Sequence, residues 1–219
     1  MIYKGVVFDF NGTLFWDTGF HDQAWDTFLH RYGLSLTDNE KHETLHGKNN
    51  KDILETLFGR QLPYDEITRF VIEKEAIYQQ ICLQQKMELA PGAVDFLNFL
   101  MSNNIQHTIA TASGIENVDF YFEHLGLSNW FNRSEVVFNN GSIKGKPDPE
   151  IFLTAMRAMN LDPRDAVIFE DSVTGITAAE NSHAGKIIIV NSAGADYSRW
   201  NHTIIQNFSD VDRSIFLKK

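Results

Sequence analysis

Five short apolar runs, most of them separated by helical patterns, constrain the fold more than any other feature of the sequence. They are GVVFDF (5–10), QHTIAT (106–111), EVVF (135–138), AVIFE (166–170) and KIIIV (186–190). Four of the five do not alternate apolar with polar residues, which is typical of strands buried on both faces of a parallel sheet. The sequence from residue 88 onward therefore predicts a doubly wound α/β domain.

Helical segments with recognisable ends lie between the later strands. Residues 91–104 repeat apolar side chains at helical spacing. A second segment has Asp148 as its expected N-cap and Pro149 as its first helical residue. A third follows the expected N-cap Ser172 and is expected to end at Gly185. Right-handed connections of this kind bring the carboxyl ends of all strands to one edge of the sheet.

The stretch between the first two strands breaks this alternation. Residues 20–32 and 64–83 each place apolar side chains on one face at helical spacing, and no strand pattern lies between them. We predict a Rossmann-like core over residues 1–14 and 88–219, with an all-helical cap domain inserted at residues 15–87. Such an insert is expected to cover the strand ends, where open α/β sheets bind ligands.

Composition restricts the partners of the chain. Its 219 residues are 43% hydrophobic, enough to bury a sizeable core. A net charge of −10 argues against a nucleic acid or an anionic membrane surface as partner. One cysteine, Cys82, excludes an intrachain disulfide and indicates a reducing compartment. Without a signal-peptide pattern or a membrane span, we expect a cytoplasmic protein, and a monomer because nothing marks an interface.

Polar side chains suited to phosphoryl transfer follow the predicted strands. They are Asp9, Thr111, Lys146, Glu170 and Asp171. Asp9 and Asp171 can hold a hard divalent cation, for which Mg²⁺ is the expected ion. Thr111 and Lys146 can neutralise phosphate oxygens, and the Asp9 carboxylate can form an aspartyl-phosphate. We therefore predict a magnesium-dependent phosphoryl-transfer site for a small phosphorylated metabolite.

The segments that carry these residues also resemble the motifs of a known family. They are DFNGT (9–13), TAS (111–113), KPDP (146–149) and FEDSVTGITAA (169–179). In this order they resemble the haloacid dehalogenase superfamily, and the helical insert resembles the small cap of its β-phosphoglucomutase-like branch. The resemblance implies sugar-phosphate phosphatase or mutase activity, Mg²⁺, a phospho-aspartate intermediate and a cap that closes on the substrate.

The resemblance assigns roles to residues of the core. It implies catalytic roles for Asp9, Asn11, Thr111 and Lys146. It implies phosphate binding by Thr111, Ala112, Ser113 and Lys146. It implies metal binding by Asp9, Glu170, Asp171 and the backbone carbonyl of Asn11. Asp9 is the expected nucleophile.

In the cap, LHGKNNKDIL (45–54) resembles the substrate-specificity loop of the branch, and His21 stands where its mutase-like members carry a histidine. The candidate substrate-binding residues of the cap are His21, Gly47, Lys48 and Asn50. Mutases place an arginine in this loop to grip a distal phosphate, and Asn50 stands at the aligned position. Lys48 can supply a positive charge but cannot bind a phosphate through two parallel N–H groups, as arginine does. We therefore favour a phosphatase over a phosphosugar mutase.

Asn11 is the larger departure from the family pattern. Phosphatases and mutases of the family carry an aspartate there, which acts as general acid and general base. An amide has no proton to exchange at ordinary pH, and such catalysis is typically worth about 10²- to 10⁴-fold.

Several interpretations of Asn11 stay open. We favour a phosphatase with attenuated turnover, which needs a good leaving group or another acid such as His21, and rank second a protein that binds a phosphorylated ligand without turnover. An engineered substitution is a third. A fourth is chemistry that never used this acid: a dehalogenase, or a phosphonatase-like C–P hydrolase with Lys48 or Lys51 forming a Schiff base. Deamidation of the Asn11-Gly12 pair would restore a carboxylate.

Overall fold

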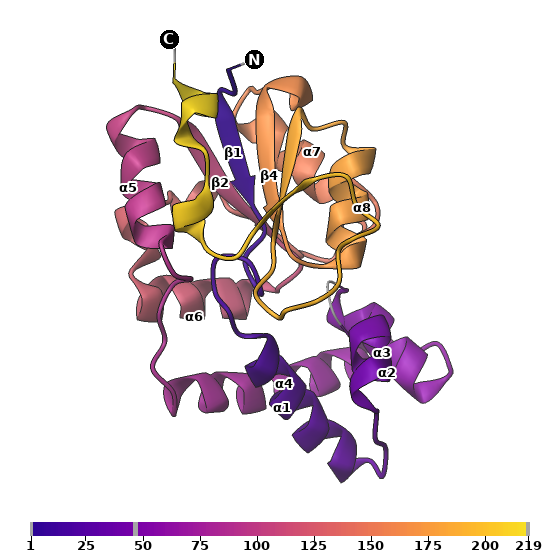
Figure 1. The fold of residues 1–219 in the computed structure, drawn as a ribbon. Coiled ribbons are helices and arrows are strands. Elements are labelled where there is room, and N and C mark those ends of the chain that lie inside the picture. The colour runs from indigo at the N-terminus through magenta and orange to yellow at the C-terminus, as the bar shows by residue number, and fades with distance from the viewer. Residues whose placement is uncertain (1, 46–47, 218–219) are drawn as a thin grey trace. The chain divides into compact units, whose positions relative to one another are not determined.

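The computed structural model describes residues 2–45 and 48–217. The chain divides into two units, a core unit of Met1–Trp16 and Glu88–Lys219 and a helical unit of Asp17–Met87. The sheet belongs to the core unit, and helices α1 to α4 belong to the helical unit (Figure 1).

Six parallel strands form the sheet of the core unit. They are β1 (Gly5–Phe8), β2 (Gln106–Thr111), β3 (Val137–Phe138), β4 (Ala166–Glu170), β5 (Lys186–Val190) and β6 (Thr203–Ile205). Their order is β3-β2-β1-β4-β5-β6, with every neighbouring pair parallel. This order is that of a Rossmann-like sheet and confirms the predicted fold class. The sequence did not predict β6, a short edge strand in which only Ile205 is buried.

Four helices of the core unit flank the sheet. They are α5 (Ala93–Ser102), α6 (Ile115–Leu125), α7 (Glu150–Ala158) and α8 (Val173–Asn181). The predicted start of α7 was wrong by one residue, because Pro149 is the N-cap and Glu150 begins the helix. Asp148 nevertheless accepts a hydrogen bond from the Glu150 amide at 3.0 Å, so its side chain still satisfies a free donor at this end.

The ends of α8 differ in how well the sequence predicted them. Ser172 is the N-cap as expected, and its hydroxyl oxygen accepts a hydrogen bond from the Gly175 amide at 3.0 Å. The helix ends at Asn181, four residues before the predicted end at Gly185. It cannot continue because His183 adopts a left-handed φ of 57°.

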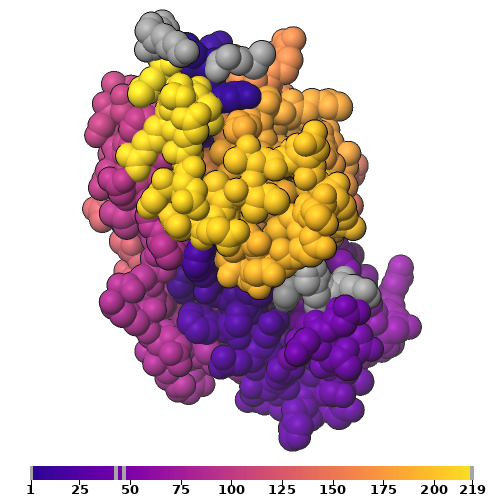
Figure 2. Space-filling model, in the orientation of Figure 1, coloured from indigo at the N-terminus to yellow at the C-terminus, as the bar shows by residue number. Residues whose placement is uncertain are grey.

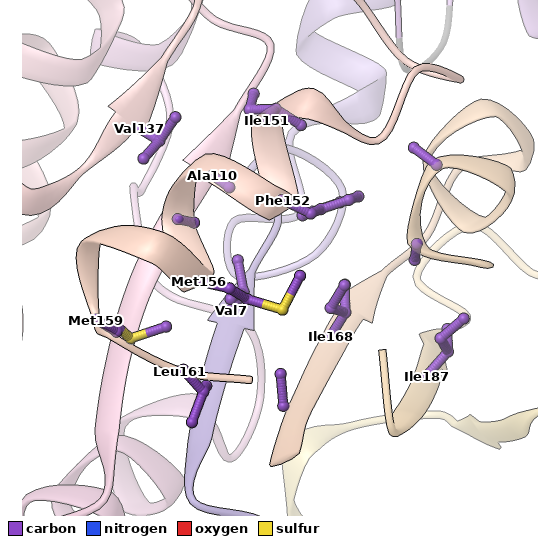
Figure 3. Close-up of a cluster of buried hydrophobic side chains, with 14 residues drawn as sticks. Val7, Ala110, Val137, Ile151, Phe152, Met156, Met159, Leu161, Ile168 and Ile187 are labelled. Atoms are coloured by element: carbon purple, nitrogen blue, oxygen red, sulfur yellow. The ribbon is translucent and has the colours of Figure 1, made fainter. Parts of the chain in front are cut away.

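Strand β1 is buried on both faces, as its unalternating sequence predicted. On one face, Val7 lies with Ile168 of β4 and Ile187 of β5 against Phe152 and Met156 of α7 (Figure 3). These aliphatic and aromatic side chains form the contact between the sheet and helices α7 and α8.

Aromatic rings cover the opposite face of the sheet. Phe8 points to this face because successive side chains of a strand point to opposite sides. The Phe8 ring lies 6.1 Å from those of Phe96 in α5 and Phe208. Phe216 also contacts Phe96, with ring centroids 6.0 Å apart. Figure 2 shows the C-terminal segment, in yellow, on the surface of the core unit. This segment thus completes the second apolar layer.

The helical unit contains α1 (Thr18–Arg31), α2 (Asp38–Thr44), α3 (Asn50–Phe58) and α4 (Tyr64–Leu83). Helices are present in both regions where the apolar pattern predicted them, and α1 packs on α4. The buried positions of α4 are Phe70, Lys74, Tyr78 and Cys82, so a lysine lies within an otherwise apolar or aromatic stripe. Within the described residues, no helix combines the length and apolar character needed to cross a membrane.

Candidate phosphoryl-transfer site

Three carboxylates meet at the carboxyl ends of β1 and β4. These strands are neighbours whose register places Phe8 opposite Phe169, so Asp9 and Glu170 follow at the same edge. One oxygen from each of Asp9, Glu170 and Asp171 lies within 4.8 Å of the others. Asp9 is 5% exposed and Glu170 is 0% exposed. The predicted acidic residues therefore form one group, in which Asp9 and Glu170 are buried and Asp171 is half-buried.

Lys146 lies against two of these carboxylates. Its Nζ is 2.5 Å from Asp9 Oδ1 and 2.5 Å from Glu170 Oε1. Burial by itself lowers the pKa of Lys146, but Asp9 and Glu170 raise it above its ordinary value. The side chain therefore stays charged and donates to both carboxylates, yet it offsets only one of three negative charges.

The remaining negative charge fits a divalent cation. Burial raises the pKa of Asp9 to about 7, although Lys146 acts in the opposite direction. Burial also raises the pKa of Asp171, and the charges of Glu170 and Asp9 add to this effect. Hard carboxylate oxygens with excess negative charge are the donor set that Mg²⁺ prefers. Asp9, Glu170 and Asp171 could hold the ion, which would favour their ionised forms.

Hydrogen bonds fix the orientation of two of the carboxylates. Glu170 Oε2 accepts from the amides of Asp171 and Ser172, each at 2.7 Å, and from the Ser172 hydroxyl at 3.1 Å. Asp171 Oδ1 accepts from the Thr13 hydroxyl at 3.1 Å. These contacts hold the acidic side chains in place.

Two glycines allow the carboxylates to come this close. Gly12 has a φ of +77°, and a Cβ atom there would lie 2.1 Å from Asp171 Oδ2. A Cβ atom at Gly175 would lie 1.7 Å from Glu170 Oε1. Gly175 was not predicted as a site residue, although a glycine inside a helix costs about 1 kcal/mol relative to alanine and therefore suggests a local requirement for space.

The side chain of Asn11 is held by three hydroxyl groups. Its Nδ2 donates to the Tyr121 hydroxyl at 2.8 Å, and its Oδ1 accepts from Ser113 at 2.8 Å and from Thr111 at 3.3 Å. Tyr121 was not predicted, because a tyrosine in the 115–125 helical pattern is indistinguishable from a core residue. The predicted role of the Asn11 carbonyl as a metal ligand stays a prediction.

The TAS segment lies at the carboxyl end of β2, next to β1. Thr111 is buried, and its hydroxyl oxygen accepts a hydrogen bond from the Ser113 amide at 3.1 Å. Ala112 is half-buried between them. The structure thus joins Thr111 and Ser113 to Asn11, while Lys146 is joined to Asp9. Both groups share the 9–13 loop, and their roles in phosphate binding stay predictions.

In the helical unit, His21 belongs to a buried polar cluster. Its ring stacks on Tyr78 with centroids 3.9 Å apart, and its Nδ1 lies 2.9 Å from Lys74 Nζ. Its Nε2 lies 3.4 Å from Asp17 Oδ2. Tyr78 also donates to this Asp17 oxygen. Both ring nitrogens of His21 therefore face polar side chains of the helical unit.

Asn50 joins the same cluster from the first turn of α3. Its Nδ2 donates to Glu75 Oε1 at 2.6 Å, and Lys74 Nζ lies 3.1 Å from the same oxygen. Lys74, which is 2% exposed, was not predicted as a site residue. The sequence pattern that could have indicated it is a lysine four residues from both Phe70 and Tyr78, on the apolar face of the predicted helix. Lys48 is half-buried, and Gly47 lies outside the described residues. Substrate binding by His21, Lys48 and Asn50 stays a prediction.

Comparison with known proteins gives a consistent set of relatives. A family model of haloacid dehalogenase-like hydrolases matches residues 3–183. The chain is 26% identical to a phosphorylated carbohydrates phosphatase of Thermotoga maritima, over 84% of this chain and 83% of the relative. It is 29% identical to a β-phosphoglucomutase of Bacillus subtilis, over 82% and 80%. A solved HAD hydrolase of family IA from Entamoeba histolytica is 28% identical with a TM-score of 0.88, covering 97% of each chain.

Proposed function

Since this chain belongs to the haloacid dehalogenase-like hydrolases, in the β-phosphoglucomutase-like branch, we propose that it is a magnesium-dependent phosphatase of a small phosphorylated metabolite. A sugar phosphate is the expected substrate. The observation that carries the proposal is the acidic group of Asp9, Glu170 and Asp171 with the buried Lys146 against it. The relative named as a phosphatase of phosphorylated carbohydrates supports the same substrate class.

In the proposed reaction, Asp9 is the nucleophile. Its carboxylate oxygen attacks phosphorus and the phosphorus–oxygen bond of the ester breaks, which forms an aspartyl-phosphate; the leaving alkoxide takes its proton from solvent water to become the alcohol. Water then attacks the phosphorus, which releases inorganic phosphate and regenerates Asp9. Lys146 and Thr111 neutralise charge on the phosphoryl oxygens. Bound Mg²⁺ supplies further electrostatic stabilisation of those oxygens.

The proposed turnover is attenuated, because Asn11 cannot exchange a proton with the leaving oxygen or the water. Its amide is already engaged by Tyr121, Ser113 and Thr111. The same observation favours a second candidate, a protein that binds a phosphorylated ligand without turning it over. A mutase is less favoured, because Asn50 stands in place of the arginine and donates to Glu75.

We propose further that the helical unit serves as a cap over the substrate, and that the protein is a monomer. His21, Lys48 and Asn50 are the described candidates for specificity within that unit. Size-exclusion chromatography with light scattering tests the oligomeric state, and a dimer mass would contradict this part of the proposal.

Phosphate release tests the proposed activity. Purified protein with Mg²⁺ is assayed on a panel of sugar phosphates and on an activated aryl phosphate. Asp9→Ala is expected to abolish release, and Asp165→Ala, which removes a surface carboxylate paired with Lys4, is expected to retain it. Removal of divalent cations with EDTA should stop the reaction.

The same assay separates the alternatives. A silent wild type with an active Asn11→Asp variant would indicate a ligand-binding protein. Activity without metal would point to dehalogenase-type chemistry. Borohydride trapping on Lys48 or Lys51 with a phosphonate substrate would indicate a phosphonatase.

A further inference from the structure

The loop that follows β5 reaches back to the acidic group at the end of β4. In this loop, the Tyr197 hydroxyl donates a hydrogen bond to the backbone carbonyl oxygen of Asp171. The Tyr197 side chain is 6% exposed and packs against Ile176 of α8 and Ile189 of β5. The tyrosine is therefore fixed at its ring by the core unit and at its hydroxyl by a candidate metal ligand.

The loop is bonded to the sheet before Tyr197 and is braced by hydrogen bonds of its own on both sides of the tyrosine. The Asn191 side chain accepts from the Ala195 amide at 2.9 Å and donates to the Ala195 carbonyl at 3.1 Å. The Asn191 amide donates to Ile205 of β6 at 2.9 Å. After the tyrosine, the Trp200 amide donates to the Tyr197 carbonyl at 2.9 Å. This bracing sets the position from which the hydroxyl reaches Asp171.

Two further hydrogen bonds hold Asp171: its amide donates to Glu170, and its Oδ1 accepts from Thr13. The absence of a Cβ at Gly12 leaves space for its Oδ2. The carboxylate direction depends on the backbone torsions of residue 171 as well as on these contacts. A hydroxyl bound to the carbonyl of the same residue restricts those torsions, because rotation of the following peptide would break the bond.

We propose that Tyr197 is a positioning residue for the metal site, which holds the Asp171 carboxylate in its binding direction through the backbone and so sets the affinity for divalent cations. The proposal rests on the metal site of the proposed function. It concerns binding rather than turnover, and it is therefore testable without a substrate. Removal of an outer partner of a metal ligand typically weakens metal affinity by about 10- to 100-fold.

The test measures binding of Mn²⁺ by electron paramagnetic resonance, with Mg²⁺ as competitor and no substrate. We expect Tyr197→Phe to weaken Mn²⁺ binding by about tenfold, because the ring stays packed and only the hydroxyl is lost. Tyr3→Phe is the matched control, because the Tyr3 hydroxyl also donates to a backbone carbonyl of the core unit, that of Gly185, at 3.0 Å. Its Mn²⁺ affinity is expected to equal that of the wild type.

A second variant tests the proposal if Tyr197→Phe does not fold. Asn191→Ala removes the bracing of the loop and is expected to weaken Mn²⁺ binding by a smaller factor. Kinetically, Tyr197→Phe should raise the Mg²⁺ concentration needed for half-maximal activity, while the substrate KM at saturating Mg²⁺ stays unchanged. A structural role alone would lower the melting temperature without this selective change.

Three results would overturn the proposal. The first is an unchanged Mn²⁺ affinity in Tyr197→Phe, or in Asn191→Ala if the first variant does not fold. The second is an equal loss of affinity in Tyr3→Phe. The third is the absence of Mn²⁺ and Mg²⁺ binding in the wild type, which would also overturn the metal dependence of the proposed function. Unchanged binding with retained phosphatase activity would overturn the role of Tyr197 alone.

Discussion

Three hydroxyl groups surround the side chain of Asn11, and each of them is able to donate to an oxygen. Ser113 and Thr111 already donate to Oδ1, whereas Tyr121 accepts from Nδ2. A phenolic hydroxyl can act as donor or acceptor, so an aspartate at position 11 could accept from all three. The surroundings of Asn11 are therefore compatible with a carboxylate of the same size.

We predict that Asn11→Asp raises kcat by about 10²- to 10⁴-fold, because a carboxyl group at this position can exchange protons with the leaving oxygen and the water. Steady-state kinetics on the most active substrate of the panel measure the change. Asn98→Asp is the matched control, since Asn98 accepts from the Trp130 indole at the surface. An unchanged kcat would show that proton transfer at position 11 does not limit turnover.

We also predict that residue 11 remains an asparagine in folded protein. Ring closure requires the Gly12 nitrogen to attack the Asn11 side chain, but this nitrogen donates to the Phe15 carbonyl at 2.7 Å. Peptide mass analysis after prolonged incubation measures deamidation. Asn140-Gly141 serves as internal reference: the Gly141 nitrogen also donates, to Asn139 Oδ1 at 3.0 Å, but both residues are exposed, whereas Asn11 is half-buried and Gly12 is buried, so this pair is expected to deamidate first. Aspartate at position 11 before any change at position 140 would contradict the prediction.

At the scale of strands and helices, the sequence predicted the parts of the site that follow from sheet topology. Continuous apolar runs indicate buried parallel strands. The carboxyl ends of such strands lie at the same edge of the sheet. The sequence alone could therefore group the residues at these strand ends, which are Asp9, Thr111, Glu170 and Asp171. Lys146 could be added because its segment follows a strand.

Contacts made by side chains in the middle of helices could not be predicted in this way. Tyr121 and Lys74 lie at buried positions of α6 and α4, where the helical period indicates only which face is buried. Which polar group a buried residue meets depends on how helices pack. Tyr197 was missed for a related reason, because its loop has no periodic pattern from which a position could be inferred.

Helix α8 provides a test of close packing at the acidic group. Gly175→Ala should reduce stability by about 1–3 kcal/mol and weaken Mn²⁺ binding, because the added methyl group displaces Glu170. Gly19→Ala in α1 is the control, since nothing lies within 4 Å of its added methyl group. That change should raise stability by up to about 1 kcal/mol, the difference in helix propensity.

Chemical denaturation with circular dichroism measures both glycine variants. A stabilised Gly175→Ala protein with normal Mn²⁺ affinity would mean that Glu170 moves aside without cost and is not held tightly.

For the whole molecule, we predict that Mg²⁺ raises the melting temperature. On the proposed function the ion would bind the folded carboxylates and not the unfolded chain, so stability should increase by about 2.7 kcal/mol at a Mg²⁺ concentration 100 times the Kd. Scanning calorimetry with and without EDTA measures the effect. Asp171→Asn should reduce the shift, whereas Asp165→Asn should leave it intact. Equal melting temperatures with and without Mg²⁺ would contradict the metal site.

Cys82 is predicted to report global unfolding of the helical unit. Its thiol is buried, and burial raises its pKa from 9.0 to about 12. At pH 8 the folded protein should therefore resist iodoacetamide, and denatured protein should react rapidly. The raised pKa also means that this thiol's contribution to stability is full below pH 9 and is lost as the pH rises toward 12. Rapid alkylation of folded protein would contradict the burial.

The central position of β1 in the sheet has a consequence for the growing chain. Its partner on one side, β4, is encoded roughly 160 residues later, as the pairing of Val6 with Val167 shows. At the usual rate of synthesis, that interval lasts on the order of ten seconds. During this time one edge of β1 lacks its neighbour, and the aspartate that follows it has neither Glu170 nor Lys146 beside it. The acidic group therefore forms late, after the whole helical unit has been synthesised.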